Sequence, residues 1–439
     1  MTREDAPVEP VDAVGPADLD DSVSPPTNAG IDPLVAPVDA SPLAAVDPTA
    51  AAASPTAPPA LSPETAPGAT ALVSLPVVDV QDLDWNAVLA AADPSIVRAR
   101  MRDIVERMET LLDRVGGPGL LFDADRTDPS DRAIRIATED GSSPLWIIGD
   151  LHGDLLTLEA ALAAIRDHAR SNDDAAPRIV FLGDFFDDAG YGLELLLRVY
   201  ELILDAPERV CVVAGNHDEA LAYQGGRFTS TVSPSDFSDF LNAHLAHEWI
   251  ERAGKLAVRL TAHATRALFF PDGLLVCHGG FPLGDLHAKL LETGDWNDPA
   301  CLSDFVWTRA HPKARRKMPN RFSRGSQFGY EDFADFCALT ARLGRPVTHM
   351  ARGHDHVEER YAVYPAYAAH PVLTTVALSR RLPREQFGSY ERVPSIARVA
   401  PGALPQVFRL HIPPSIVQGY FPRSEADASA DGATSGGAT

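Results

Sequence analysis

The sequence predicts an α/β (α+β) fold in which strands and helices alternate. Short apolar runs such as "PLWIIGD", "RIVFLGD" and "RVCVVAGNHD" have the composition of buried strands. Longer stretches between them, "DLLTLEAALAAIRDHA" and "GYGLELLLRVYELIL", have the apolar spacing of helices. Each apolar run ends in a turn of small residues that carries Asp, Asn or His. This alternation is typical of a sheet flanked by helices.

Both ends of the chain are predicted to be disordered tails. Residues 1–76 are rich in Ala, Pro, Asp, Ser and Thr, contain no aromatic residue and are nearly free of Lys and Arg. Such a composition cannot bury enough apolar surface to offset the entropy of ordering. Residues 424–439, "SEADASADGATSGGAT", have the same character, so the predicted folded domain spans residues 77–423. The sequence identifies no partner for the N-terminal tail.

A helical lead-in is predicted over residues 77–130. "DLDWNAVLAAAD" has the pattern of a short helix. Asp93 is suited to cap a second helix, with Pro94 at its first position. An apolar stripe runs on to Val115, and Gly116 and Gly117 then favour the end of that helix.

Polar side chains follow five strand-like segments in succession. They are Asp150 and His152; Asp184, Asp187 and Asp188; Asn216 and His217; His278; and His354 and His356. Asp184 lies 34 residues after Asp150, and Asn216 lies 32 residues after Asp184. Each interval suits a strand–helix–strand unit, which needs ~30 residues. Because ligands of α/β sheets bind where strands end, these groups are expected to meet in one site.

The residue types favour a metal site. Asp, His and Asn are common ligands of divalent Mn, Fe and Zn. One carboxylate shared by two ions, with separate ligands for each, would build a two-metal centre ~3.5–4 Å across. Taken alone, "GDLHGD" is also an ordinary turn and His278 an ordinary buried histidine. The five motifs together favour a cofactor of two divalent metal ions (Mn, Fe or Zn).

The order of these motifs resembles the calcineurin-like metallophosphoesterase superfamily, and within it most closely the phosphoprotein phosphatase (Ser/Thr phosphatase) family. That family carries GDxHG, GDxVDRG, GNHE, HGG and a late RAH, where this chain has "GDLHGD", "GDFFDDAG", "GNHDE", "CHGGF" and "RGHDH". The similarity spans roughly residues 145–380. The resemblance implies a metallophosphoesterase β-sandwich flanked by helices, with two metals at the sheet edge.

The resemblance also implies roles for single residues. The implied metal ligands are Asp150 and His152 for one ion, Asp184 for both, and Asn216, His278 and His354 for the second. His356 is a further candidate, because superfamily members ending in GHxH place this His on the first metal, whereas Ser/Thr phosphatases usually have Gln nearby. A metal-bridging water would attack phosphorus while His217, oriented by Asp187, donates a proton to the leaving group.

The chain departs from the family where substrate phosphate is bound. The family's GDxVDRG ends in a phosphate-binding Arg, and the matching residue here is the anion Asp188. Replacement cations are sought in "HPKARRKMPNRFSRG", with Arg321 and Arg324 as the candidates that spacing does not separate. The simpler alternative is a solvated basic loop. The late stretch "VALSRRLPREQFGSY" also differs from the family.

Bulk properties exclude several functions. A formal net charge of −23 over 439 residues argues against binding nucleic acid or an anionic membrane through a general field. No stretch reaches the ~18 apolar residues of a membrane span. The N-terminus lacks the basic and apolar regions of a secretory signal, and the four cysteines are in no CxxC pair, so a cytoplasmic location is expected.

The predicted function is metal-dependent hydrolysis of phosphomonoesters, with a phosphoprotein as the favoured phosphoester substrate. Two alternatives remain open. A nucleotide or diadenosine-polyphosphate hydrolase would share the metals, and "GNHD" is common among such relatives. A catalytically weak pseudophosphatase that binds phosphoproteins would explain Asp188 and the long tails.

Overall fold

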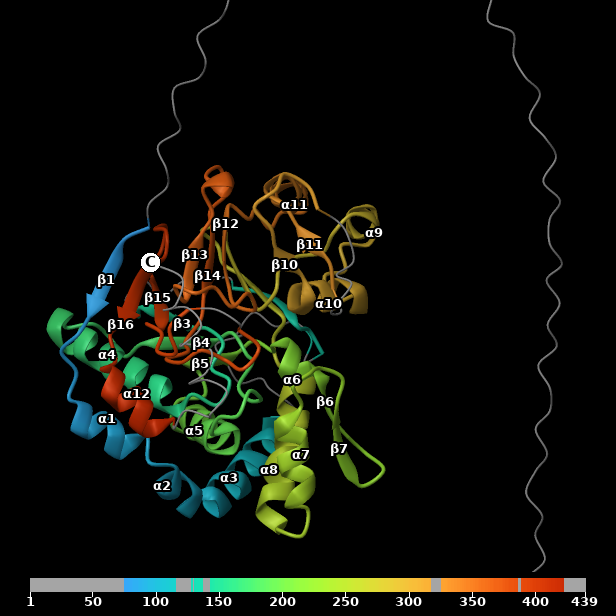
Figure 1. The fold of residues 1–439 in the computed structure, drawn as a ribbon. Helices are drawn as coiled ribbons and strands as arrows, with labels where there is room; N and C mark the ends of the chain where they lie inside the picture. The colour runs from blue at the N-terminus through green and yellow to red at the C-terminus, as the bar shows by residue number, and fades with distance from the viewer. Residues whose placement is uncertain are drawn as a thin grey trace, which may run out of the picture. The chain divides into compact units, whose positions relative to one another are not determined.

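Two mixed sheets flanked by helices form the folded part of the chain (Figure 1). The computed structural model describes residues 75–115, 128, 130–136, 143–316, 325–385 and 388–421. The predicted α/β (α+β) class is therefore confirmed. The predicted tails, apart from Leu75 and Pro76, lie outside the described residues.

The first sheet has six strands and contains the three parallel strands that the sequence indicated. Its order is β1 (Val77–Val80), β16 (Gln406–Leu410), β15 (Ser395–Val399), β3 (Leu145–Ile148), β4 (Arg178–Phe181) and β5 (Val210–Val212). Strands β3, β4 and β5 run parallel, and β15 is antiparallel to β3. Parallel neighbours need crossover connections, and α4 (Leu155–Asn172) and α5 (Gly192–Asp205) supply them.

The second sheet also has six strands. Its order is β13 (Tyr361–Val363), β14 (Val372–Thr375), β12 (His349–Arg352), β9 (Leu274–Cys277), β8 (Ala267–Phe269) and β2 (Ala133–Arg135). Strand β12 is parallel to both β9 and β14. Consequently β9 and β12, like β3 to β5 in the first sheet, deliver their carboxyl ends to a common edge.

The remaining elements surround these sheets. The helices are α1 (Trp85–Ala91), α2 (Pro94–Ala99), α3 (Met101–Val115), α6 (Asn216–Ala220), α7 (Asp236–Ala243), α8 (Glu248–His263), α9 (Asp285–Thr293), α10 (Pro299–Trp307), α11 (Tyr330–Arg342), α12 (Pro414–Tyr420) and the short 3-10 helix Pro365–Tyr367. Two small pairs complete the set: β6 (Leu221–Gln224) with β7 (Arg227–Ser230), and β10 (Arg309–Ala310) with β11 (Gln327–Phe328).

The lead-in differs from its prediction in two ways. Residues 77–80 form strand β1 rather than helix, because they pair in parallel with β16 from the far end of the domain. No local pattern could indicate such a partner. The helix predicted from Pro94 to Val115 is interrupted at Arg100, which ends α2. The Asp93 cap is confirmed, since its carboxylate accepts a hydrogen bond from the Ser95 amide at 2.8 Å.

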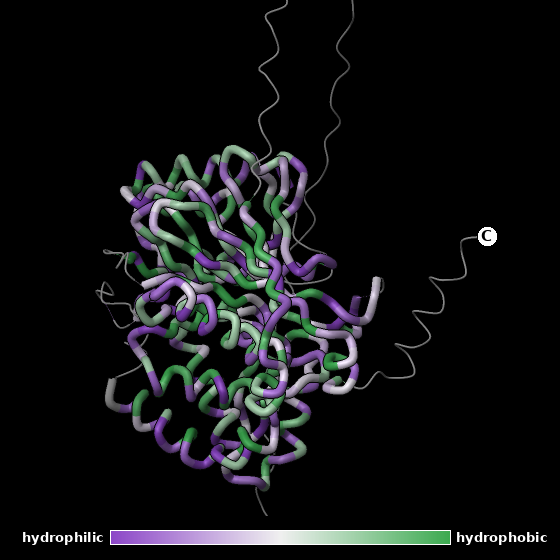
Figure 2. The backbone as a smooth tube through the Cα atoms, turned by 90° about the vertical axis from the view of Figure 1, so that its left-hand side faces the viewer, coloured by the Kyte–Doolittle hydropathy of each residue, from purple (hydrophilic) through white to green (hydrophobic). Residues whose placement is uncertain are grey.

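The core lies between the sheets and their covering helices. All four residues of β3 are buried, including Trp146, and most of the N-terminal part of α4 is buried as well. Figure 2 shows hydrophobic segments gathered in the middle of the folded part and polar segments toward its outside. Among the described residues, no helix is both long and apolar enough to cross a membrane.

Candidate active site

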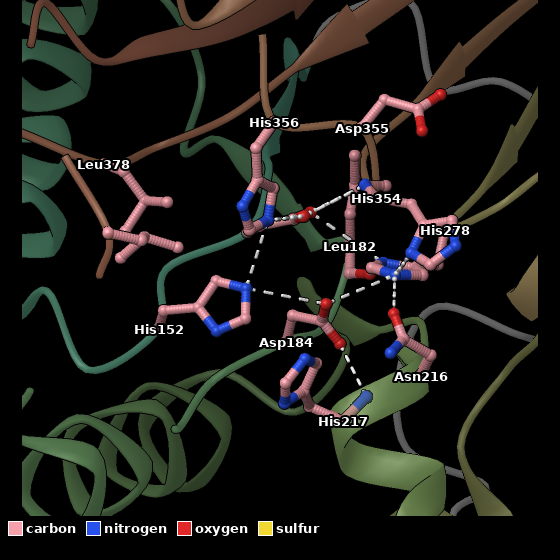
Figure 3. Close-up of polar contacts among 12 residues, drawn as sticks. His152, Leu182, Asp184, Asn216, His217, His278, His354, Asp355, His356 and Leu378 are labelled. Carbon is pink, nitrogen blue, oxygen red and sulfur yellow. Dashed lines mark hydrogen bonds and ion pairs between the residues drawn. The ribbon is translucent and has the colours of Figure 1, made fainter. Parts of the chain in front are cut away.

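Loops from both sheets bring the predicted polar side chains together (Figure 3), and Asp184, Asn216, His217, His354 and His356 line one cavity. Seven of them form what we call the ligand cluster: Asp150, His152, Asp184, Asn216, His278, His354 and His356. They follow β3, β4, β5, β9 and β12, as the parallel strand directions require. The cavity has a volume of about 440 Å³.

One side of the ligand cluster joins Asp150, His152 and His356. His356 Nε2 lies 3.2 Å from Asp150 Oδ2 and 3.2 Å from His152 Nε2. Burial alone would raise the pKa of Asp150. The neighbouring His278 and the hydrogen bond with His356 instead hold it below its ordinary value. Asp150 is thus an anion whose oxygens face two imidazole rings.

The other side joins Asp184, Asn216, His278 and His354. His278 Nε2 lies 3.4 Å from Asp184 Oδ2, 3.1 Å from Asn216 Oδ1 and 3.1 Å from His354 Nδ1. Asp184 Oδ2 also lies 3.6 Å from His152 Nε2. Asp184 therefore stands between the two halves of the cluster, where one carboxylate can serve two cations.

The protonation pattern of these groups fits metal binding. His152 Nδ1 lies 3.0 Å from the Phe186 carbonyl oxygen, and His278 Nδ1 lies 2.8 Å from that of Leu182. A carbonyl only accepts hydrogen bonds, so each Nδ1 carries a hydrogen, and Nε2 of each ring faces Asp184. Nε2 is then the ring atom left to bind a cation beside that carboxylate.

Burial adds to this fit. It holds the pKa of His152 and of His354 well below the ordinary histidine value. Neutral imidazole is the form that binds a metal ion. The described residues include three overlapping groups of three His and Asp side chains whose ligand atoms lie within 4.8 Å of one another. These groups suit the metal site that the sequence predicts, without identifying the ions.

His217 and Asp187 form a pair at the edge of the ligand cluster. His217 Nδ1 lies 2.7 Å from Asp187 Oδ2, and the Phe237 amide donates to Asp187 Oδ1 at 2.9 Å. Burial lowers the pKa of His217, but the Asp184 carboxylate and the hydrogen bond to Asp187 outweigh it and raise the pKa above its ordinary value. The ring therefore favours its protonated form, with Nε2 directed to the cavity.

Two glycines allow the loops to approach so closely. A Cβ on Gly353 would lie 2.2 Å from Asp150 Oδ1, and one on Gly215 would lie 2.2 Å from Asp184 Oδ1. His152, Asp184 and His354 themselves have positive φ, which is unusual for residues with side chains. Strained backbone of this kind is common at functional sites, where surrounding structure holds it in place.

The predicted phosphate-binding arginines cannot be placed. Arg321 and Arg324 lie outside the described residues. The nearby Arg315 lies on the surface and pairs with Glu331 and Asp335 at 2.8 Å. Instead, Arg384, which the sequence analysis did not select, enters the cavity beside Asp188 and His217. The feature of the sequence that could have pointed to such a cation is Asp188, because a buried carboxylate needs a positive charge nearby.

Comparison with known proteins agrees with this geometry. Residues 143–358 match the family model described as calcineurin-like phosphoesterase, and this stretch contains every residue of the ligand cluster. The chain belongs to this family. It is thus a metallophosphoesterase whose His and Asp residues form a candidate metal site.

Similarity of the metallophosphoesterase to Ser/Thr phosphatases is distant. It is 25% identical over 222 residues to the serine/threonine-protein phosphatase 6 catalytic subunit of Drosophila melanogaster, covering 50% of this chain and 65% of that protein. It is 42% identical over 81 residues to the serine/threonine-protein phosphatase 4 catalytic subunit of Candida glabrata, covering 17% of this chain and 23% of that protein.

A solved structure of a protein serine/threonine phosphatase from Saccharomyces cerevisiae is also similar to the metallophosphoesterase. It matches 73% of this chain and 90% of its own, with 15% identity and a TM-score of 0.46.

Proposed function

We propose that this metallophosphoesterase hydrolyses phosphomonoesters and acts on phosphoserine or phosphothreonine in proteins. The observation that carries the proposal is the His217–Asp187 pair at the edge of the ligand cluster, because His217 lines the same cavity as Asp184, Asn216, His354 and His356. A metal-dependent phosphatase needs cations for the phosphoryl group and a proton donor for the leaving oxygen.

In the proposed mechanism, each side chain has a separate task. Asp150, Asp184, Asn216 and the histidines of the ligand cluster would hold two divalent cations, with Mn, Fe and Zn as the candidates. When bound, the ions supply positive charge that offsets the charge of the phosphoryl group and lower the pKa of a water molecule.

Proton transfer falls to His217. Its Nδ1–H remains on Asp187 Oδ2, while the proton on Nε2 passes to the leaving oxygen. Asp187 is a positioning residue, because its other oxygen is held by the Phe237 amide and the carboxylate therefore fixes the plane of the ring. A serine or threonine alkoxide is a poor leaving group, so this proton is needed most for such substrates.

A second candidate function has specific support. Three arginines, Arg309, Arg384 and Arg392, line the cavity. Several cations around one site suit a polyphosphate chain, so a nucleotide or diadenosine-polyphosphate hydrolase is the alternative. The third possibility is a protein that binds phosphoproteins through the same ligand cluster but hydrolyses them little or not at all.

One panel of substrates separates the three functions. Purified full-length protein is loaded in turn with Mn, Fe and Zn, and kcat/KM is measured for p-nitrophenyl phosphate, a phosphoserine peptide and diadenosine tetraphosphate. The proposal expects the phosphoserine peptide to exceed diadenosine tetraphosphate. The reverse order would favour the polyphosphate hydrolase. Full metal binding without turnover of any ester would favour the binding protein.

A further inference from the structure

Asp188 presents a charge that the ligand cluster does not use. Its side chain is buried. Neither carboxylate oxygen accepts a hydrogen bond of good geometry from the described residues. The nearest cationic group is the guanidinium of Arg384, with Nη2 at 3.1 Å from Asp188 Oδ2. His152 Nδ1 is 3.3 Å away, but it also lies close to the Phe186 carbonyl.

Arg384 reaches this position from the loop that follows β14. The neighbouring residue anchors the loop, because Glu385 accepts hydrogen bonds from Arg360 Nη1 and Nη2 at 2.7 and 2.8 Å and from the Leu382 amide at 2.6 Å. The Arg384 side chain is still 35% exposed, so one edge of the guanidinium faces the cavity. It is therefore held at its base and accessible at its tip.

The guanidinium lies beside His217 and His152, next to the position that a phosphoryl group would take if His217 protonates the leaving oxygen. Arg384 Nη1 is 3.3 Å from His217 Nε2, and Nη2 is 3.2 Å from His152 Nε2. It thus spans the distance between the proton donor and the ligand cluster. Guanidinium is the side chain best suited to hold phosphate oxygens through two parallel hydrogen bonds.

We infer that Arg384 binds the substrate phosphate, and that Asp188 is the positioning residue that directs it there. We call these two residues the phosphate side. The resemblance implied a cation on the loop after β4, but that loop carries the anion Asp188, and the cation Arg384 comes from the loop after β14. This inference rests on the proposed function, and it identifies Arg384 as the cation that binds the substrate.

Other described cations around the cavity are less suited to this role. Arg309 Nη1 donates to the His354 carbonyl at 2.8 Å and lies 3.1 Å from Asp355 Oδ1. These contacts hold it against the loop after β12. Arg392 donates to the Ser389 carbonyl and lies 3.9 Å from Glu358. Arg384 Nη1, by contrast, lies 3.3 Å from His217 Nε2.

Inorganic phosphate is the probe for the test, because it is the product of the proposed reaction. Its dissociation constant is measured by calorimetry on the Mn-loaded full chain, with Mn content determined in parallel. Arg384→Ala should raise the dissociation constant about 10- to 100-fold, the range for hydrogen bonds between charged groups. The dissociation constant of Arg384→Lys should lie between those of wild type and Arg384→Ala, because lysine keeps the positive charge but cannot donate two parallel hydrogen bonds. Arg102→Ala, an exposed surface change of equal charge, should match wild type.

A double-mutant cycle tests the role of Asp188. Asp188→Asn alone should raise the dissociation constant of phosphate by about threefold or more, whereas in the Arg384→Ala background it should add no further loss. If Asp188 had only a structural role, Asp188→Asn would raise the dissociation constant of phosphate by the same factor with Arg384 present and with Arg384→Ala. That additive result would overturn the positioning role.

The inference and the proposed function can fail separately. If wild type binds phosphate through Arg384 but hydrolyses no phosphoester, the function is wrong and the inference stands. If wild type hydrolyses phosphoesters and Arg384→Ala binds phosphate as Arg102→Ala does, the inference is wrong. It is equally wrong if Arg384→Ala loses its Mn, since the residue would then support the ions rather than the phosphate.

Discussion

The ligand cluster and the phosphate side both contribute residues to the lining of one cavity but are built differently. The cluster draws its residues from turns directly after strands, and close backbone packing fixes them. The phosphate side joins two loops through a single ion pair between Asp188 and Arg384. With the roles proposed above, the chemistry of the ions would depend on the closely packed centre of the fold, whereas substrate recognition would depend on the Asp188–Arg384 ion pair between two loops.

The largest effect should follow from removing the shared carboxylate of the cluster. Asp184→Asn keeps the size of the side chain but removes the anion that faces both His152 and His278. Turnover of p-nitrophenyl phosphate should fall by about 10³-fold, the upper end for loss of one electrostatic group in an active site. Mn content, measured by mass spectrometry of the metal, should fall with it. Full activity in this variant would exclude a bridging role.

A change at His217 should separate proton transfer from metal binding. His217→Gln should lower kcat for a phosphoserine peptide by about 10²- to 10⁴-fold, since the leaving alkoxide then lacks its proton donor. The loss should be smaller for p-nitrophenyl phosphate, whose leaving group is more stable as an anion. Mn content should stay at the wild-type level. Equal losses on the two esters would argue against general acid catalysis.

A methyl group can disturb the cluster without removing a ligand. The Cβ in Gly353→Ala would lie 2.2 Å from Asp150 Oδ1, so that carboxylate must move. Mn affinity, measured by titration, should fall about 10- to 100-fold, as for changes that misplace a metal ligand. Gly419→Ala is the matched control, because a Cβ there meets nothing within 4 Å. An unchanged Mn affinity in Gly353→Ala would show that the cluster is less rigid than proposed.

The contrast between the two regions also explains what could be predicted from the sequence. Asp150, Asp184 and His278 were predictable because each follows an apolar run and a small-residue turn, and parallel strands must end at the same edge. Arg384 was not predictable, because it follows no such pattern and because Asp188, with which it forms an ion pair, is far away in the chain. The same reason applies to β1, whose pairing with β16 made a strand of residues predicted as part of a helical lead-in.

The smallest expected effect concerns the support of the phosphate side. The Asp236 carboxylate accepts hydrogen bonds from the Asp188 and Ala189 amides, both at 2.9 Å, and these two residues have positive φ. Asp236→Ala should lower the free energy of unfolding by about 1–3 kcal/mol, because two amide donors lose their acceptor. It should also raise KM severalfold, since Asp188 would then direct Arg384 less firmly. Mn content should not change, and Asp239→Ala, on the same helix, is the control. If Asp236→Ala lost its Mn instead, the ligand cluster and the phosphate side would both depend on Asp236. The two regions would then differ in position but not in how they are held in place.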